Sequence, residues 1–239
     1  MSSTEIGTKT AIQASPQEQV KFVDRINDFM HANRKVFLFL VVAVMVGVVG
    51  LGIFSAVSSN LVVKSTIALD GLEASYKEFS VLEESEKPAS SLTLIEETDK
   101  LIAKYGKRYA AVRASMIKAE VLLAINDAPA AEKALASLAE TYAKSHLAPV
   151  ALANAAAIAE DRGDADLALT YLTRIESTYP SAVGIGRITL SIGRIYEATK
   201  LYEKAFETYT RLVATGAESD WTKIAHDRII LLRSQGLVK

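Results

Sequence analysis

The chain has no cysteine among its 239 residues, which excludes disulfides, thiolate catalysis and cysteine-based metal sites. Proline and glycine are also sparse, at 5 and 12 residues, too few for an all-β protein with many tight turns. The formal net charge is −1, so no broad positive field would attract nucleic acid. What remains is rich in alanine, lysine and glutamate, which favour helices. We therefore expect an all-α protein with no nucleic-acid partner.

The sequence has no arrangement of residues typical of an enzyme or a metal site. Its three histidines, His31, His146 and His226, form no ligand spacing. The stretch "GIGR" at 184–187 lacks the third glycine and the preceding strand of a phosphate-binding loop. We interpret "RGD" at 162–164 as a turn between helices and not as an adhesion motif. We therefore expect no catalytic residue, no metal and no cofactor, and predict that the chain is not an enzyme.

Residues 36–57 form one long apolar segment without a charged residue. As a helix rising about 1.5 Å per residue, the segment is roughly 33 Å long, enough to cross the roughly 30 Å core of a bilayer. A cleavable signal peptide has a shorter apolar region of about 7–15 residues, although "AVS" at 56–58 resembles a cleavage site. A helix buried in a soluble core is the other alternative, but it needs a polar side that this segment lacks. We predict a single transmembrane helix that acts as a signal-anchor.

The positive charges that flank this segment predict its orientation. Lys21, Arg25, Arg34 and Lys35 precede it, whereas Lys64 is the one lysine or arginine that follows it up to residue 76. Because lysine and arginine are enriched on the cytoplasmic side of a membrane span, we expect a cytoplasmic N-terminus. The alternative is the topology of a mitochondrial import receptor, which faces its repeats to the cytosol.

The predicted layout has three parts. Residues 1–35 form a cytoplasmic head that is disordered at first; residues 17–32 are then either an amphipathic helix or a poorly ordered lead-in to the span. Residues 36–57 contact the lipid bilayer of a bacterial inner membrane, and residues 58–239 form a periplasmic, extracytoplasmic domain. Small residues four apart in the span would also let two copies form a homo-oligomer, unless they only reflect the frequency of such residues in membrane helices; they are Ala43 with Gly47 and Gly52 with Ala56.

The rest of the chain repeats with a period of 37 residues. One tyrosine and two small residues recur at the same positions of successive units. Within each helix of a unit, the recurring positions lie three or four residues apart, which places them on one face of that helix. Each unit is therefore predicted to be two amphipathic helices, with small residues where the pair approaches closely. The predicted repeat-packing residues are Tyr105, Tyr142 and Tyr179; Ala131, Ala168 and Ala205; and Ala119, Ala156 and Gly193.

The clearest unit, "IGRIYEATKLYEKAFETYTRL" at residues 192–212, resembles a tetratricopeptide repeat (TPR). Gly193, Tyr196, Ala205 and Tyr209 stand at the spacings of that pattern. The period exceeds the usual TPR length of about 34 residues, and the tryptophan-like first position is missing. The resemblance implies an α-solenoid of TPR-like hairpins. We expect helices at 90–105, 109–124, 128–143, 148–161, 165–178, 183–198 and 201–214, and a C-terminal capping helix within 219–236.

In proteins that resemble TPRs, the first helix of each pair lines a concave groove that binds peptides or partner helices. Arg187 and Arg194 are seven residues apart, so they share a helix face at a separation of about 10 Å and could hold an acidic segment. Alternatively, these arginines are solvated or pair with Glu160 and Glu197. By repeat register, the candidate protein-binding groove contains Arg113, Glu120, Asn154, Arg187 and Arg194.

The overall layout resembles that of YfgM-like ancillary Sec translocon subunits, which have a short head, one span and a TPR-like periplasmic domain. This resemblance implies protein partners at a translocon or chaperone complex. We therefore predict a membrane-anchored adaptor or scaffold that binds proteins on the periplasmic side. The alternative is a permanent structural subunit of an envelope machine, such as a secretion or flagellar assembly.

Overall fold

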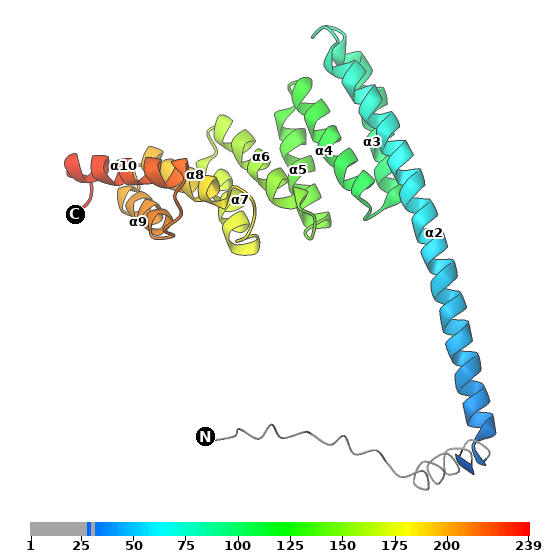
Figure 1. Ribbon diagram of the computed structural model, residues 1–239. Helices are drawn as coiled ribbons and strands as arrows, with labels where there is room; N and C mark the ends of the chain where they lie inside the picture. Colours follow the sequence, from blue (N-terminus) through cyan, green and yellow to red (C-terminus); the bar gives the residue numbers. More distant parts are fainter. Residues whose placement is uncertain (1–27, 30–31) are drawn as a thin grey trace, which may run out of the picture. The chain divides into compact units, whose positions relative to one another are not determined.

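The computed structural model describes residues 28–29 and 32–239 (Figure 1), so almost all of the predicted cytoplasmic head lies outside the described residues. The described residues contain helices and no strand, which confirms the all-α prediction. The chain divides into two compact units, Met1–Leu61 and Val62–Lys239. The helices are α2 (Arg34–Ser80), α3 (Lys87–Tyr105), α4 (Tyr109–Ala124), α5 (Ala128–Thr141), α6 (Leu147–Asp161), α7 (Ala165–Thr178), α8 (Ile185–Ala198), α9 (Tyr202–Val213) and α10 (Asp220–Ser234).

The described part of the first unit consists mainly of the N-terminal portion of α2. Every residue from 36 to 57 is exposed, and no part of the most apolar window of α2 is buried. By length and composition this helix is able to cross a membrane. The exposure argues against the alternative that the segment is the core helix of a soluble protein.

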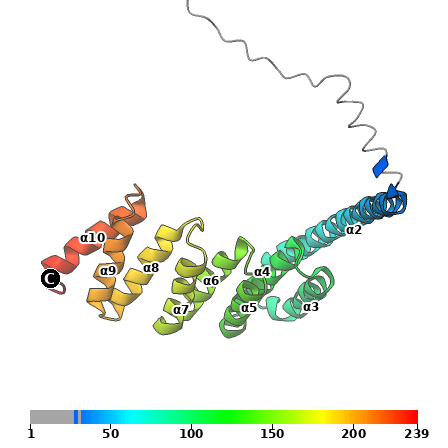
Figure 2. The same cartoon turned by 90° about the horizontal axis from the view of Figure 1, so that it is seen from below.

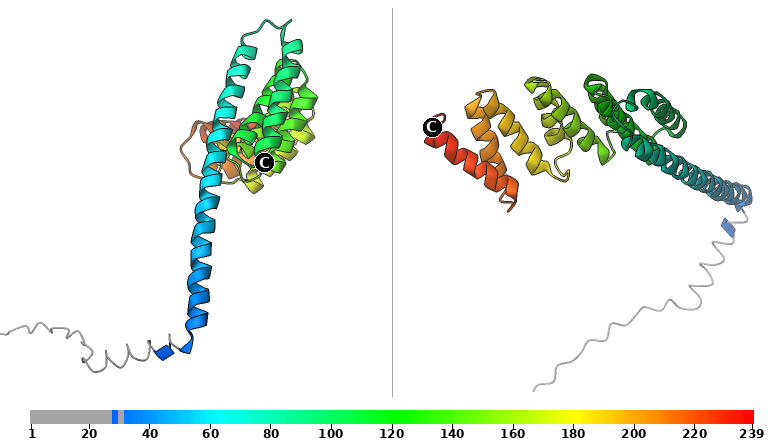
Figure 3. Two further views of the ribbon diagram at one scale, coloured as in Figure 1. Left: turned by 90° about the vertical axis from the view of Figure 1, so that its right-hand side faces the viewer. Right: turned by 90° about the horizontal axis from the view of Figure 1, so that it is seen from above.

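The second unit is a row of antiparallel helical hairpins (Figure 2). The part of α2 in this unit pairs with α3, and residues 81–86 form the loop that joins the two helices (Figure 3). The pairs α4–α5, α6–α7 and α8–α9 follow in chain order, and α10 packs on α9. Each predicted helix is present, and those over 109–124 and 165–178 have the predicted bounds. The helix expected from residue 90 begins earlier, at Lys87, and Pro88 lies in its first turn, where the absence of its N–H removes no hydrogen bond within the helix.

The turns inside the hairpins repeat with the period of the sequence. Asn126, Gly163 and Lys200 are 37 residues apart and all have a positive φ, at 61°, 81° and 63°. The next residue caps the following helix in two of the three turns. Asp127 accepts a hydrogen bond from the backbone N–H of Ala130, and Asp164 accepts one from that of Leu167. These caps satisfy N–H groups that have no partner within the helix.

The predicted small residues lie where the two helices of each pair meet. Ala131, Ala168 and Ala205 are fully buried. Ala119, Ala156 and Gly193, on the partner helices, are also buried. Buried residues from α2 to α8 form one hydrophobic core, and α9 and α10 contribute a second, smaller one. Small side chains at these contacts let the helix backbones approach closely, as expected for stacked hairpins.

The repeated tyrosines connect successive hairpins through their hydroxyl groups. Tyr105 donates a hydrogen bond to the backbone carbonyl of Lys64 at 3.2 Å, and Tyr142 donates one to that of Gly106 at 3.3 Å. Tyr179 donates to the carbonyl of Ala143 at 2.9 Å. Each hydroxyl therefore reaches back to the preceding part of the row, which gives these tyrosines a polar role besides packing.

Candidate protein-binding groove

The five predicted groove residues lie on the first helices of three hairpins. Arg113 and Glu120 are on α4, Asn154 is on α6, and Arg187 and Arg194 are on α8. The side chains on α6 and α8 are exposed, whereas the two on α4 are partly buried. Three of the five side chains, those of Arg113, Glu120 and Arg194, form ion pairs.

Arg113 is held between two carboxylates. Its Nε donates to Oε1 of Glu73 at 3.2 Å, and its Nη1 donates to Oε1 of Glu120 at 3.0 Å. Burial lowers the pKa of the Arg113 guanidinium, but the hydrogen bonds to Glu120 and Glu73 outweigh burial, so its pKa is raised overall. Because Glu73 is on α2, this cluster joins α2 to α4. Arg113 therefore has internal partners that the repeat register does not reveal.

Arg194 of α8 forms a bidentate ion pair with Glu160 of α6. The two N–H···O distances are 2.6 and 2.8 Å, a geometry typical of arginine with a carboxylate. The hydrogen bond to Glu160 also raises the pKa of Arg194. This pairing is one of the alternatives that the sequence left open for Arg194.

Glu197, the other carboxylate considered for these arginines, pairs with Arg228 of α10. The Nε of Arg228 donates to Oε2 of Glu197 at 3.0 Å, and the Tyr209 hydroxyl donates to the same oxygen at 3.0 Å. Burial, together with the charge of Glu197, raises the pKa of Tyr209. Charged contacts thus connect α2 with α4, α6 with α8, and α8 with α10.

Between α4 and α6 the ion pair that joins α6 to α8 has no counterpart, because the corresponding residues are uncharged. One period before Glu160 and Arg194 stand Leu123 and Ala157, which are both exposed. Val150 of α6 is 45% exposed at the position that arginine holds on α4 and α8. The surface at Leu123, Val150 and Ala157 is therefore apolar. Arg187, at the position of Val150 one period later, has no ion-pair partner among the described residues.

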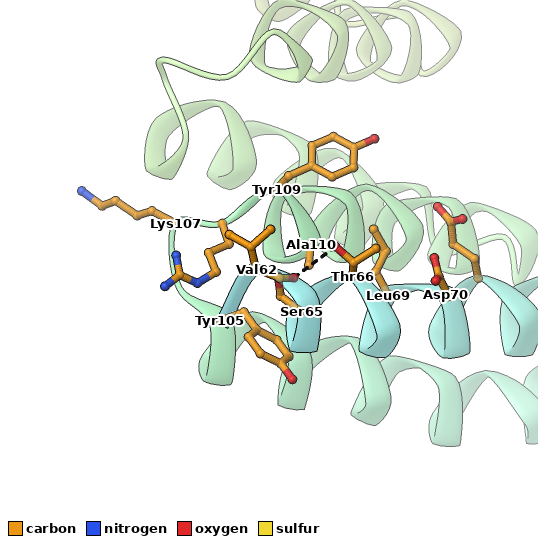
Figure 4. A pocket seen from close by; sticks show the side chains of 11 residues that line it. Val62, Ser65, Thr66, Leu69, Asp70, Tyr105, Lys107, Tyr109 and Ala110 are labelled. Atoms are coloured by element: carbon orange, nitrogen blue, oxygen red, sulfur yellow. Dashed lines mark hydrogen bonds between the residues drawn. The ribbon is translucent and has the colours of Figure 1, made fainter. Parts of the chain in front are cut away.

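The sequence-based search missed a second polar region, at the loops between hairpins. Lys107 and Lys144 are 37 residues apart and lie in the α3–α4 and α5–α6 loops. Two hollows of about 620 and 640 Å³ lie at these loops; Figure 4 shows the first, with Lys107 and Tyr109 at its rim. The signal available in the sequence was the pair of stretches "KYGKRY" and "YAKSH", which contain basic residues and no carboxylate.

Within residues 28–29 and 32–239, no group of three or more His, Cys, Asp or Glu residues is arranged to hold a metal ion. The described features are a row of helical hairpins, a surface crossed by ion pairs, and loops with positive charge. A solenoid of this kind defines a class of helical-repeat proteins whose surfaces serve protein–protein interaction.

A family model described as "Tetratricopeptide repeat-like domain" matches residues 27–224. Because the match covers more than half of the chain, this protein belongs to the tetratricopeptide repeat-like family. The match confirms the predicted TPR-like solenoid. Proteins with this fold are typically scaffolds without enzymatic activity.

Solved structures show the same fold. A tetratricopeptide repeat protein from Parabacteroides merdae ATCC 43184 is 12% identical, with a TM-score of 0.51 over 70% of this chain and 61% of that one. This chain therefore spans less than two thirds of the Parabacteroides merdae protein. A variant of the nearly identical TPR-like repeats of a Podosopora anserina kinesin light chain is also 12% identical, with a TM-score of 0.50 over 70% of this chain and 88% of that one. No curated protein matches significantly.

Proposed function

We propose that this protein is a membrane-anchored adaptor whose helical repeats bind other proteins on the extracytoplasmic side of a bacterial inner membrane. The observation that carries the proposal is the exposure of the whole apolar segment 36–57. Apolar surface on this scale is unfavourable in water and needs to be covered by lipid or protein. The length of the segment fits a bilayer, and the excess of lysine and arginine before it supports a cytoplasmic N-terminus. In this proposal residues 1–35 form the head, 36–57 the span and 58–239 the periplasmic domain.

The partner-binding surface in this proposal is the face of α4, α6 and α8. Arg113 and Arg194 are engaged by carboxylates of the chain itself. The exposed Val150 and Asn154 therefore offer apolar and hydrogen-bonding contacts, while Arg187 offers a charge without a partner among the described residues. A partner segment with an apolar side chain followed by a carboxylate would fit these three positions.

The layout of the chain, which resembles that of YfgM-like subunits, supports partners at a translocon or chaperone complex. The proposal predicts binding that is specific to the groove and reversible. Stoichiometric co-purification in detergent that persists at high salt would instead indicate the alternative, a permanent subunit of an envelope machine.

Site-specific photocrosslinking of the full chain in intact bacterial cells tests the groove. A photoreactive amino acid at Val150 should capture defined proteins, whereas the same amino acid at Lys133, exposed on α5, should capture few. Arg187→Glu should reduce capture at position 150 about tenfold or more, the loss expected for a charge-assisted contact that becomes repulsive. Lys133→Glu is the matched control. Equal capture at both sites, or capture that Arg187→Glu does not change, would contradict the groove.

The anchor has its own test, which does not depend on any partner. The protein should remain in the membrane fraction after alkaline carbonate extraction, and a tag after Lys239 should be labelled only from the periplasmic side. Release by carbonate would exclude the transmembrane anchor. Labelling from the cytosolic side alone would reverse the proposed orientation.

A further inference from the structure

Four basic residues lie at the loops that connect the first three hairpins of the second unit. Lys104, Lys107 and Arg108 lie in and beside the α3–α4 loop, and Lys144 lies in the α5–α6 loop. The two loops are joined, because the Tyr142 hydroxyl donates a hydrogen bond to the carbonyl of Gly106. The rings of Tyr109 and His146 also stack, with centroids 6.0 Å apart. We refer to Lys104, Lys107, Arg108 and Lys144 as the basic loop cluster.

The chain does not neutralise this charge. Within the described part of the chain, none of the four side chains forms an ion pair. The stretches 104–109 and 141–147 contain no Asp or Glu. The loop at the other end of the α2–α3 hairpin has the opposite character, with Glu83, Glu84 and Glu86. The first hairpins are therefore basic at one end and acidic at the other.

The basic loop cluster borders a hollow of about 620 Å³ whose lining includes Val62, Ser65 and Thr66 of α2 together with Lys107 and Arg108. In Figure 4 Lys107 lies on one side of this hollow and Asp70 on the opposite side. Glu73, the other acidic residue of the lining, accepts a hydrogen bond from Arg113. The end of the hollow near Lys107 and Arg108 is therefore positive.

This positive end is close in sequence to the apolar segment. Only residues 58–61 separate Val57, the last residue of that segment, from Val62 in the hollow. Even a fully extended chain would cover at most roughly 18 Å over this distance, and a helix would cover about 7.5 Å. Electrostatic attraction to a charged surface acts over about 8–10 Å at physiological salt. If residues 36–57 span a bilayer, the basic loop cluster is held within or near that range of the lipid headgroups.

We propose that the basic loop cluster binds the headgroups of anionic phospholipids and so docks the repeat domain against the membrane. The proposal rests on the membrane anchor proposed above. Lysine and arginine near an anionic surface each strengthen binding by a factor of about five. Tyr109, 56% exposed beside the cluster, is an aromatic residue of the kind enriched at the lipid–water interface.

The absence of cysteine makes a direct test practicable. The full chain carries one introduced cysteine, at Ala143 in the α5–α6 loop or at Ser85 in the acidic loop, and each is labelled with a fluorophore. The labelled proteins are reconstituted in bilayers of zwitterionic lipid alone or with about one third phosphatidylglycerol, both containing a headgroup-nitroxide quencher. We expect strong quenching at position 143 in the anionic bilayer, weak quenching in the zwitterionic one, and little at position 85 in either. High salt should reduce the quenching at 143.

Charge reversal provides the decisive comparison. Lys107→Glu with Lys144→Glu should lower the ratio of docked to undocked protein at least about 25-fold, because two such contacts are lost. Lys133→Glu with Lys200→Glu changes the net charge equally at a distance from the loops and should leave quenching at 143 unchanged. Equal quenching in the two bilayers, or equal loss in the two double variants, would overturn the proposal.

Flotation of the same samples separates this inference from the anchor on which it rests. Protein that floats with the vesicles after carbonate treatment but shows no lipid-dependent quenching refutes the docking alone. Protein that carbonate releases refutes the anchor, and the docking proposal with it.

Discussion

At the scale of single residues, Gly193 of α8 lies directly against the ring of Tyr209 of α9. A Cβ added at Gly193 would lie 2.3 Å from Cε1 of the Tyr209 ring, well inside van der Waals contact. One period earlier the corresponding residues are Ala156 and Leu172, and one period before that Ala119 and Leu135. Glycine thus accompanies the large aromatic ring, and alanine accompanies leucine.

This arrangement predicts that Gly193→Ala destabilises the protein although alanine favours helix more than glycine does. Overpacking of this kind costs about 1–3 kcal/mol of unfolding free energy, which exceeds the helix-propensity gain of about 1 kcal/mol. Adding Tyr209→Leu should recover part of the loss, because it restores the Ala–Leu combination of the earlier units. Urea unfolding of the detergent-solubilised full chain, followed by circular dichroism, measures the change.

Gly71→Ala is the matched control for this substitution. Gly71 is in the interior of α2, and a Cβ there would meet nothing within 4 Å. The same chemical change should therefore raise the unfolding free energy, by about 0.5–1 kcal/mol. If Gly193→Ala also proved stabilising, or if Tyr209→Leu made the double variant additively worse, the proposed contact would be wrong.

At the scale of helices, the start of α9 lacks a feature that α5 and α7 have. The residues before α5, α7 and α9 are Asp127, Asp164 and Leu201, with similar backbone angles (φ −92°, ψ 66°; φ −87°, ψ 75°; φ −87°, ψ 61°). The two aspartates cap their helices with a side-chain hydrogen bond, and the leucine does not. An aspartate at 201 would therefore find a backbone already suited to capping.

We expect the cap formed in Leu201→Asp to contribute about 1 kcal/mol, the usual effect of such a cap. Leu201 is 43% exposed, so removing its partly buried side chain costs a similar amount of free energy, and the cap is measured against Leu201→Ala and not against the unchanged protein. Leu201→Ala, which removes the leucine without adding an acceptor, reports that loss separately. In thermal unfolding the aspartate variant should melt above the alanine variant; equal melting temperatures would show that no cap forms.

The helices and their order could be predicted because their signals are local and repeated. Buried alanines at 131, 168 and 205 recur every 37 residues, and each belongs to an apolar face with helical spacing. The state of the groove could not be predicted in the same way, because ion pairing depends on how neighbouring helices are set. Arg113 finds Glu73, 40 residues away on α2, and no repeat register indicates that contact.

The basic loop cluster illustrates the same limit. Each loop alone contains only a few lysines or arginines, which is common in solvent-exposed turns. The two loops are brought together in the folded chain, where the Tyr142 hydroxyl donates a hydrogen bond to the carbonyl of Gly106 and the ring of Tyr109 stacks on that of His146. The 37-residue spacing of Lys107 and Lys144 was visible in the sequence, but its meaning required knowledge that the two loops lie side by side.

At the scale of the repeat domain as a whole, stability should vary along the row of hairpins. In a solenoid each repeat contacts only its neighbours, so free energy is contributed by single repeats and by the interfaces between them. The larger hydrophobic core extends from α2 to α8, whereas α9 and α10 form a core of five buried residues. Leu190 and Tyr196 of α8 pack against that smaller core, and Tyr196 also packs against the larger one and so connects the two.

Hydrogen exchange of the full chain should therefore show two levels of protection. Backbone amides of α4 to α7 are expected to exchange slowly, through opening of most of the domain, while those of α9 and α10 exchange faster, through local opening of the C-terminal end. Gly193→Ala acts at the α8–α9 contact, so it should accelerate exchange in α8 to α10 and leave α4 and α5 nearly unchanged. An equal acceleration in all helices would instead mean that the domain unfolds as a single cooperative unit. The chain would then lack the graded stability that nearest-neighbour stacking implies, and a partner bound at α4 and α6 would stabilise the C-terminal helices as much as its own site.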